Sequence, residues 1–457
     1  MRVLPAIVMA VIILQSCGNN GNYRVFTKDP LLYCKTVKKL NDIVLENNFP
    51  PMIGSRNYVY ANIAAYEVVA AGDDSTYRSL AGQIKNMPPM PKWNGGKIDY
   101  QLAAVLAFIK VGNAVTFPEG SMMEYYGSVL KDAENAGMPS EVSNNSKIYA
   151  DSMSGQIMAW AKKDNYAQTR SAEKYSVLEE DGRWVPTPPM YAQGMEAHWK
   201  EIRTLVLDSS AQCMPPRPPK YNMKDSNSAF YKLAMEVKTT GDSLNKEQKH
   251  IADFWDDNPF KLNVSGHVMF ATKRFSPPGH WMNIAGIAAD KAKLDFNTTV
   301  YAYTKTAIAL FEGFVSCWDE KYRSNMVRPE TVINKYVDPE WRPYIQTPPF
   351  PSYTSGHSVI SAAAAEVMSD IYGDNFSFTD TSSTEFGIAP RSFSSFRQAS
   401  LEAGISRLYG GIHYRSDLEA GTVEGIMVGK LVVDRLKMRK TKTLAMSTTG
   451  HLSKISK

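Results

Sequence analysis

Three short motifs in the last third of the chain set the tightest limit on how it can fold. In chain order they are Lys321-x6-Arg328-Pro329, Ser355-Gly356-His357 and Ser406-Arg407-x5-His413-x3-Asp417. Together they supply three cationic side chains, a hydroxyl beside a flexible glycine, and two histidines. Lysine and arginine neutralise a tetrahedral oxyanion such as phosphate or vanadate, and arginine offers it a planar fork of donors. A fold that uses all three motifs must bring them around one oxyanion.

The residues around the first motif predict its place in a helix. Apolar side chains recur at helical spacing from about residue 304 to Trp318, and Lys321 extends the same face by one turn. Proline disfavours α conformation in the residue before it. Arg328, which precedes Pro329, is therefore expected where the chain leaves this helix.

The second and third motifs are also expected near helix ends. Ser355 precedes a strong helical pattern over residues 358–372, which a glycine closes. Ser355 and Gly356 are therefore predicted at a helix N-terminus, where free N–H groups and the positive end of the dipole favour an anion. His413 and Asp417 are four residues apart. If both are helical they share a face, and the carboxylate can orient the imidazole.

The three motifs resemble the signature of the type-2 phosphatidic acid phosphatase superfamily, K-x6-RP, PSGH and SR-x5-H-x3-D, and within it the vanadium-dependent haloperoxidases. Thr354 stands where this signature has a proline before Ser-Gly-His. The haloperoxidase branch adds a tryptophan three residues before the lysine and a Phe-Pro pair before Ser-Gly-His. Trp318 and Phe350-Pro351 match both additions. The resemblance is specific over residues 300–436 and general, as a helix-rich scaffold, over the first half.

The resemblance implies an enzyme that oxidises iodide, bromide or chloride with hydrogen peroxide at a vanadate cofactor. The residues that would hold the vanadate oxygens are Lys321, Arg328, Ser355, Gly356 and Arg407. His413 would form the single protein bond to vanadium, and Asp417 would orient its ring. His357 would act as the acid–base residue on the opposite side, and Lys321 would also help to polarise hydrogen peroxide.

The same residues suit a phosphatase, with phosphate in the place of vanadate. His413 would then attack phosphorus to form a phosphohistidine, and Asp417 would stabilise the imidazolium. His357 would protonate the leaving alcohol and then activate water. Trp318 and Phe350, which would wall a halide pocket, favour the haloperoxidase. A third alternative is an envelope protein that only binds oxyanions, but such a binder needs no acid–base histidine.

Length and periodicity predict the architecture. A chain of 457 residues exceeds the usual size of a single core. Helical periodicity is clearest over residues 60–71, 100–114, 146–161 and 246–254. We therefore expect an all-α fold of two helical bundles, with the catalytic site in the C-terminal bundle. The proline-rich stretch 214–219 predicts a boundary between an N-terminal helical half at 25–213 and a catalytic domain at 220–436. The basic segment 437–457 is expected to be a mobile tail.

The first residues resemble an export signal. Arg2 precedes an apolar run over residues 3–14, which is too short to span a bilayer. Leu14-Gln15-Ser16-Cys17 then resembles a bacterial lipobox, so residues 1–17 are predicted to be a lipoprotein-type signal peptide with lipidation at Cys17. The alternative is a plain signal peptide with an incidental cysteine. Lipidation predicts an exported lipoprotein of the bacterial envelope that meets the membrane only through its lipid anchor.

Neither the net charge nor the cysteines indicate a nucleic-acid partner or a metal site. The net charge of +5 is small for this length and gives no sign of a nucleic-acid partner. The resemblance implies hydrogen peroxide and halide as partners, and a homodimer, since haloperoxidases of this type often associate. Cys34, Cys213 and Cys317 show no metal-ligand spacing and are expected to serve in packing, with a disulfide between two of them left open.

Several other polar residues are secondary candidates. The aspartates that could brace an active-site arginine are Asp256, Asp257 and Asp319. The histidines expected at the surface or satisfied in the core are His198, His250, His280 and His451. Ser265-Gly266-His267 repeats the letters of the second motif without its neighbours and is interpreted as a coincidence. Gly421, Gly425 and Gly429 recur every four residues after Asp417 and indicate close packing between helices.

Overall fold

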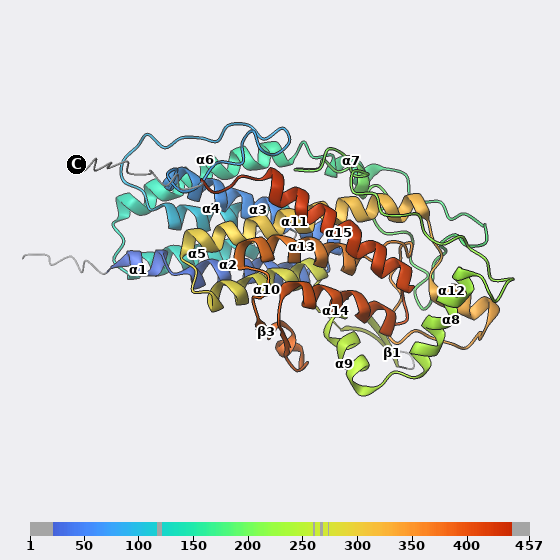
Figure 1. The fold of residues 1–457 in the computed structure, drawn as a ribbon. Coiled ribbons are helices and arrows are strands. Elements are labelled where there is room, and N and C mark those ends of the chain that lie inside the picture. Colours follow the sequence, from blue (N-terminus) through green and yellow to red (C-terminus); the bar gives the residue numbers. More distant parts are fainter. Residues whose placement is uncertain (1–21, 117–120, 259–260, 266–267, 273, 441–457) are drawn as a thin grey trace, which may run out of the picture.

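The computed structural model describes residues 22–116, 121–258, 261–265, 268–272 and 274–440. The predicted signal peptide 1–17 with Cys17, His267, His451 and most of the predicted tail lie outside these residues. The described chain is predominantly helical, which confirms the all-α prediction (Figure 1). Within the described residues we find no helix with the length and apolar character that a membrane span requires.

The helices before the proline-rich stretch are α1 (Tyr23–Thr27), α2 (Pro30–Glu46), α3 (Pro51–Gly72), α4 (Tyr100–Val115), α5 (Ser121–Asn135), α6 (Ser140–Ala161) and α7 (Tyr166–Ser171). Those after it are α8 (Ala229–Asp242), α9 (Lys246–Phe254), α10 (Pro277–Lys291), α11 (Phe296–Ser324), α12 (Pro329–Tyr336), α13 (Gly356–Tyr372), α14 (Phe396–Tyr409) and α15 (Arg415–Arg435). The short strands form two antiparallel pairs, β1 (Lys261–Ser265) with β2 (Val268–Thr272) and β3 (Phe378–Asp380) with β4 (Arg391–Phe393).

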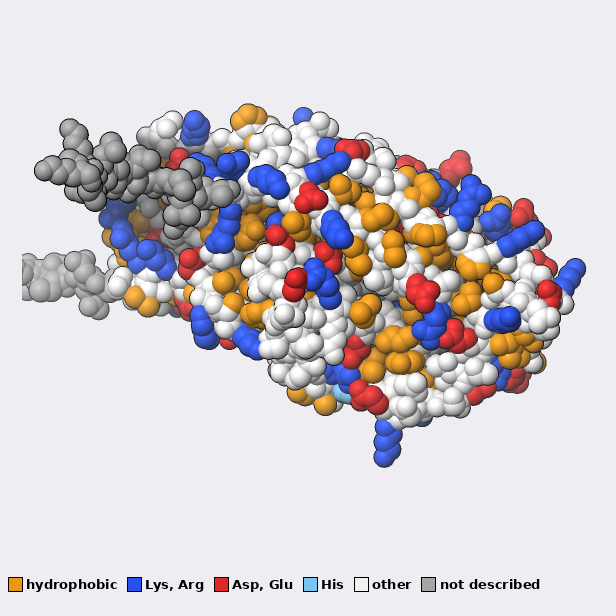
Figure 2. Space-filling view, in the orientation of Figure 1, with side chains coloured by type: hydrophobic (Ala, Val, Ile, Leu, Met, Phe, Trp, Pro, Cys, Tyr) orange, Lys and Arg blue, Asp and Glu red, His pale blue; other side chains and the backbone are white. Residues whose placement is uncertain are grey.

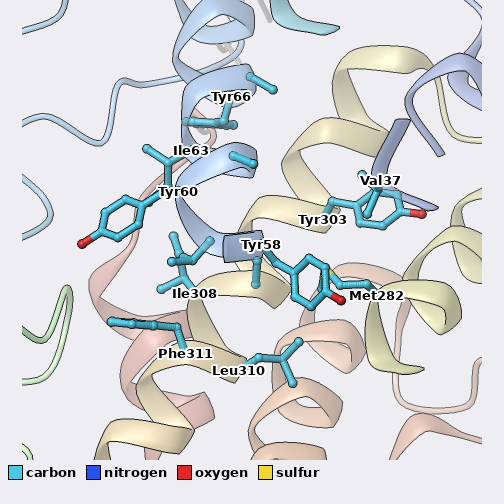
Figure 3. Packing of buried hydrophobic residues seen from close by; sticks show 14 of the residues in the cluster. Val37, Tyr58, Tyr60, Ile63, Tyr66, Met282, Tyr303, Ile308, Leu310 and Phe311 are labelled. Atoms are coloured by element: carbon cyan, nitrogen blue, oxygen red, sulfur yellow. The ribbon is translucent and has the colours of Figure 1, made fainter. Parts of the chain in front are cut away.

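The long helix α11 lies at the centre of the fold and packs against both α3 and α13 (Figure 1). One large hydrophobic cluster contains buried side chains from both halves of the chain. Figure 3 shows part of it, with Tyr58 of α3, Met282 of α10 and Ile308 of α11. Because this cluster draws on helices on both sides of the proline-rich stretch, the two halves share a core. The exact domain division at 213 and 220 stays a prediction.

The ends of α11 and α13 fix the first two motifs in space. Asp295 caps α11 by accepting from the Thr298 N–H at 2.7 Å, so the helix begins earlier than the apolar pattern predicted. It ends at Asn325, whose φ of 49° is left-handed. Ser355 caps α13 as predicted, and its hydroxyl accepts from the Ser358 N–H at 3.4 Å.

The glycines of α15 hold this helix unusually close to α13. A Cβ added to Gly425 would overlap the Val359 carbonyl oxygen and lie 2.8 Å from the Ala362 Cβ. A Cβ on Gly421 would lie 3.0 Å from the carbonyl oxygen of Ser355. The predicted close packing is therefore correct, and it fixes the start of α13, where the second motif lies.

The described cysteines are unpaired, and charges of both signs are mixed on the visible face of the molecule (Figure 2). Cys34, Cys213 and Cys317 are free thiols, and the last two are buried. On the face shown in Figure 2, basic and acidic side chains are interspersed rather than gathered into a single charged patch.

Candidate active site

Lys321 is fully buried in the last turn of α11 and holds the chain between the first two motifs. Its ammonium group donates to the carbonyl oxygens of Pro351, Ser352 and Thr354 at 3.0, 3.1 and 2.5 Å. Burial lowers the pKa of Lys321 to about 8. Because three carbonyls accept from its three N–H bonds, Lys321 in this structure anchors the 351–354 loop under the site.

Arg328 joins the first motif to the third. Its Nε donates to the Phe350 carbonyl at 2.8 Å, and its Nη1 donates to the Ile412 carbonyl at 2.8 Å and lies 3.0 Å from Nε2 of His413. Within the described part of the chain, its Nη2 is buried and has no hydrogen-bond partner. An unpaired buried guanidinium N–H is costly, so this atom suits an anionic ligand.

His413 is held by the Asp417 carboxylate, whose Oδ2 lies 3.0 Å from its Nδ1. The same oxygen accepts from the Ser352 hydroxyl at 2.5 Å and from the Tyr414 N–H at 3.2 Å. These contacts place the imidazole proton on Nδ1 and leave the lone pair on Nε2. Burial and the nearby cation of Arg328 lower the pKa of His413 well below its ordinary value, so the ring is neutral.

The helical geometry predicted for this pair is wrong in detail. His413 lies before α15, whose first residue is Arg415, whereas Asp417 belongs to its first turn. The two side chains meet because the chain turns at the capping residue Tyr414, and they do not share a helix face. The carboxylate nevertheless orients the imidazole, as expected.

His357 is the second residue of α13 and faces a cation and a carboxylate. Its Nε2 lies 3.3 Å from Nη1 of Arg407 and 3.7 Å from Oδ2 of Asp257. Burial, with the neighbouring Arg407, lowers the pKa of His357 to about 4, so its ring is neutral near pH 7. A neutral imidazole can accept a proton.

Arg407 is fixed from the side of α9. Its Nη1 donates to the Trp255 carbonyl at 2.5 Å, and its Nε is also buried and has no hydrogen-bond partner among the described residues. The carboxylates of Asp256 and Asp257 offset part of its burial. Asp319, by contrast, contacts Arg323 at 3.2 Å, so it does not brace an arginine of the site.

A cavity of about 400 Å³ opens over these groups. The motif residues in its wall are Gly356, His357, Arg407 and His413, whereas Lys321, Arg328 and Ser355 do not line it. Trp318 and Phe350 form an aromatic wall with ring centroids 5.0 Å apart. The cavity is therefore mostly apolar, with its polar groups gathered at the motifs.

The first half of the chain also contributes to this cavity, which no motif indicated. Pro188, Met190, Ala192 and Met195 line it from the irregular segment after α7. The Met195 carbonyl accepts from the Trp318 indole at 3.2 Å and from the Tyr322 hydroxyl at 2.6 Å, which ties this segment to α11. A coil without a repeated pattern gives no sequence signal for such a role.

The remaining secondary candidates separate clearly. His198 is at the surface beside Glu201, at 2.8 Å, as expected. His280 is buried as expected for a satisfied core residue, between the carboxylates of Asp257 and Asp380. Glu424 of α15 was missed: it accepts from the Ser316 hydroxyl at 2.7 Å beneath the Lys321 loop. Nothing in the sequence indicated this role, because a single glutamate among other charged residues of a helix is expected to be exposed.

Comparison with known proteins places this arrangement in a family. A family model described as the VCPO second helical-bundle domain matches residues 301–441. The crystal structure described as the first bacterial vanadium-dependent iodoperoxidase superposes with a TM-score of 0.85 and 44% sequence identity, covering 90% of this chain and 98% of that one. A comparison with curated protein sequences gave no significant match.

Two more distant structures share the fold. They are the holo and apo forms of a bacterial vanadium-dependent chloroperoxidase, with TM-scores of 0.64 and 0.62 and identities of 14% and 15%. Each match covers 85% of this chain, and 93% and 95% of the respective chloroperoxidase chains.

The helical fold and the oxyanion site thus define a haloperoxidase that works with hydrogen peroxide and halide. The chain belongs to the vanadium-dependent haloperoxidases. Membership implies a vanadate cofactor, and the residues present fit it. The unpaired guanidinium nitrogens of the motif residues Arg328 and Arg407 suit its oxygens, and the neutral Nε2 of His413 is a ready ligand.

Proposed function

We propose that this haloperoxidase acts on iodide, and that the residues of the three motifs carry the reaction in the roles given below. The observation that carries the proposal is His413, whose Nδ1 is held by Asp417 while its Nε2 faces the Arg328 guanidinium. The iodide preference rests on the bacterial iodoperoxidase that is 44% identical over 98% of its length.

Bound vanadate would supply a Lewis acid that activates hydrogen peroxide for attack by halide. Nε2 of His413 would bond to vanadium, and the free N–H groups of Arg328 and Arg407 would bind its oxygens. The N-terminus of α13, with the Ser355 hydroxyl and the Gly356 N–H, would add neutral donors. Lys321 would contribute positive charge from beneath and keep the 351–354 loop in place, and a small motion would be needed to free one of its N–H groups.

His357 would accept a proton from incoming hydrogen peroxide. Its neutral state near pH 7 supports this role, because a base must be unprotonated to act. Trp318 and Phe350 would form the halide side of the cavity, where an aromatic wall excludes water around a large, weakly hydrated anion.

The decisive experiment uses residues 18–457, stripped of metal and then incubated with orthovanadate. Hydrogen peroxide and iodide, bromide or chloride are supplied, and triiodide formation or dye bromination is followed by absorbance. Vanadate-dependent oxidation, fastest with iodide and lost in His413→Ala, is the expected result. A chromogenic phosphate monoester tests the vanadate-free protein. Phosphate release without any halide oxidation would instead make His413 a phosphorylated nucleophile.

The remaining proposals concern location and assembly. We propose that the chain is exported and lipidated at Cys17, on the strength of the apolar run 3–14 and the lipobox-like residues after it. Labelling bacteria that express the full chain with a radioactive fatty acid should mark the protein, and Cys17→Ser should lose both the label and the membrane fraction. Light scattering of the soluble form would reveal a homodimer.

A further inference from the structure

His280 on α10 lies between two buried carboxylates behind the cavity. Its Nδ1 is 2.9 Å from Oδ1 of Asp257, and its Nε2 is 2.9 Å from Oδ2 of Asp380. The His280 side chain is fully buried, as is that of Asp380 at the end of β3. Because both ring nitrogens face carboxylates, the ring donates from both and carries a positive charge. Burial alone would lower its pKa, but the two carboxylates raise it to about 10.

Asp257 connects this ion cluster to the active site. Its Oδ1 faces His280, while its Oδ2 lies 3.7 Å from Nε2 of His357. The rings of Trp255 and Phe254 lie 4.7 and 5.4 Å from the His280 ring and shield the cluster from water. The carboxylate that faces the reacting side of the cavity is therefore held from behind by a buried cation.

A second anchor holds the far end of the cluster. Oδ1 of Asp380 accepts from the Ser382 N–H at 2.9 Å, so its carboxylate has a fixed orientation. Three parts of the chain, the segment just after α9, the helix α10 and the strand β3, meet at this point. Simple packing could be achieved with apolar side chains, whereas a buried ionised triad costs desolvation energy. That cost argues that the triad serves to hold the charged Asp257 carboxylate in a fixed position at the cavity.

We propose that His280 and Asp380 are positioning residues of the peroxidase reaction, which fix the Asp257 carboxylate and its charge beside His357 and Arg407. The inference rests on the proposed role of His357 as the proton acceptor. His280 and Asp380 do not line the cavity, and they act through the Asp257 carboxylate that His280 contacts.

The proposal has an electrostatic signature at His357. The charged or titratable groups that face His357 are Arg407 on α14, Asp256 and Asp257 after α9, and His413 before α15. His280→Asn removes a positive charge behind Asp257 and should raise the pKa of His357. Asp380→Asn keeps a hydrogen-bond acceptor but removes a negative charge, and should lower that pKa. Shifts of roughly half a pH unit in opposite directions are expected.

The first measurement uses protein without vanadate, so that it does not depend on turnover. The Cε1–H signals of histidines labelled with carbon-13 are titrated by NMR, and His357→Gln assigns the His357 signal. His198→Asn and Asp181→Asn, both at exposed sites away from the cavity, are the matched controls and should leave the His357 titration unchanged. Opposite shifts in His280→Asn and Asp380→Asn support the proposal.

The second measurement follows kcat/KM for hydrogen peroxide against pH in the vanadate-loaded enzyme. The acid limb should move to higher pH in His280→Asn and to lower pH in Asp380→Asn. If both variants only lose thermal stability while the NMR titration and the acid limb stay in place, the cluster is structural and the proposal is wrong. Absence of vanadate-dependent halide oxidation in the wild-type protein would contradict the proposed function separately, and the NMR result would still stand.

Discussion

Glu424 accepts a hydrogen bond of 2.6 Å from the Thr354 hydroxyl, and both side chains are buried. Thr354 stands where the superfamily signature has a proline, and its carbonyl also accepts from Lys321 at 2.5 Å. The departure from the signature therefore coincides with a polar network that links α15 to the loop before Ser-Gly-His. Glu424 lies outside all three motifs, yet it supports the loop that Lys321 anchors.

The first prediction concerns stability against pH. Burial raises the pKa of Glu424 to about 7, from an unfolded value near 4.5. The folded state thus binds the proton more tightly than the unfolded state, so the contribution of Glu424 to stability falls as pH rises from about 4.5 to about 7. Glu424→Gln cannot ionise, and its unfolding free energy should fall less over this range than that of the wild type. Urea unfolding at several pH values measures the difference, with exposed Glu419→Gln as the control.

The second prediction concerns the orientation of His413. In Asp417→Asn the amide can donate to Nδ1, which moves the imidazole proton to Nε2 and blocks the lone pair. Vanadate affinity should fall by roughly 10- to 100-fold, as for other residues that orient a metal-bound histidine. Calorimetric titration of the metal-free protein with orthovanadate checks this, and Glu419→Gln on the same helix should bind normally. Unchanged affinity in Asp417→Asn would show that the carboxylate does not select the tautomer.

The third prediction concerns the close contact of α13 and α15. Gly425→Ala places a Cβ against the Val359 carbonyl, so α13 must shift or the helices must separate. We expect a loss of about 2 kcal/mol or more of stability, together with weaker vanadate binding, because α13 carries Ser355 to His357. Thermal unfolding and vanadate titration measure the two effects.

Gly155→Ala on α6 is the matched control for that substitution. Apart from the neighbouring backbone of α6 itself, no atom of the described residues lies within 4 Å of a Cβ added to Gly155, so the same change there should stabilise the helix by about 0.5–1 kcal/mol. Equal effects of the two substitutions would mean that the glycine contact with α13 is unimportant.

The fourth prediction concerns where oxidised halogen reacts first. Met190 lines the cavity and Met214 does not, although each side chain is 50% exposed. A thioether sulfur takes the halogen from hypohalous acid, and hydrolysis then leaves a sulfoxide and returns halide. During turnover with the preferred halide, mass spectrometry should find sulfoxide at Met190 well before Met214.

Reagent hypohalite added to the vanadate-free protein provides the reference, because it should oxidise both methionines at similar rates. Hydrogen peroxide without halide measures the background. Equal oxidation of Met190 and Met214 during turnover would show that the oxidant leaves the cavity before it reacts.

Much of the fold and of the site was predictable from the sequence, because the motif residues determine the local backbone conformation and the packing around them. The cap at Ser355, the exit at Arg328 before a proline and the packing glycines of α15 all follow from backbone conformation or from the size of a side chain. The contact of His413 with Asp417 was foreseen, although through the wrong geometry. Lys321 shows the limit, since only the folded loop reveals that its ammonium group is already bound by carbonyls.

The contacts that the sequence did not reveal share one property: the two partners are far apart in the sequence. His280 meets Asp380 across 100 residues, and Glu424 meets Thr354 across 70. No periodicity or spacing records such pairs in a single chain. The sequence alone does not distinguish a buried histidine from an exposed one. The charge of His280 depends on the two carboxylates that the fold places beside it.

The contact between Met195 and α11 joins two parts of the chain that contribute differently to the cavity. The reactive groups come from the last third, whereas part of the cavity wall comes from a coil more than a hundred residues earlier, which the Met195 carbonyl ties to α11. The sequence of this coil can therefore change while the motif residues stay the same. Exchanging this coil between related haloperoxidases, with the Met195 contact to α11 kept, would be a direct way to change substrate selectivity while the catalytic residues stay in place.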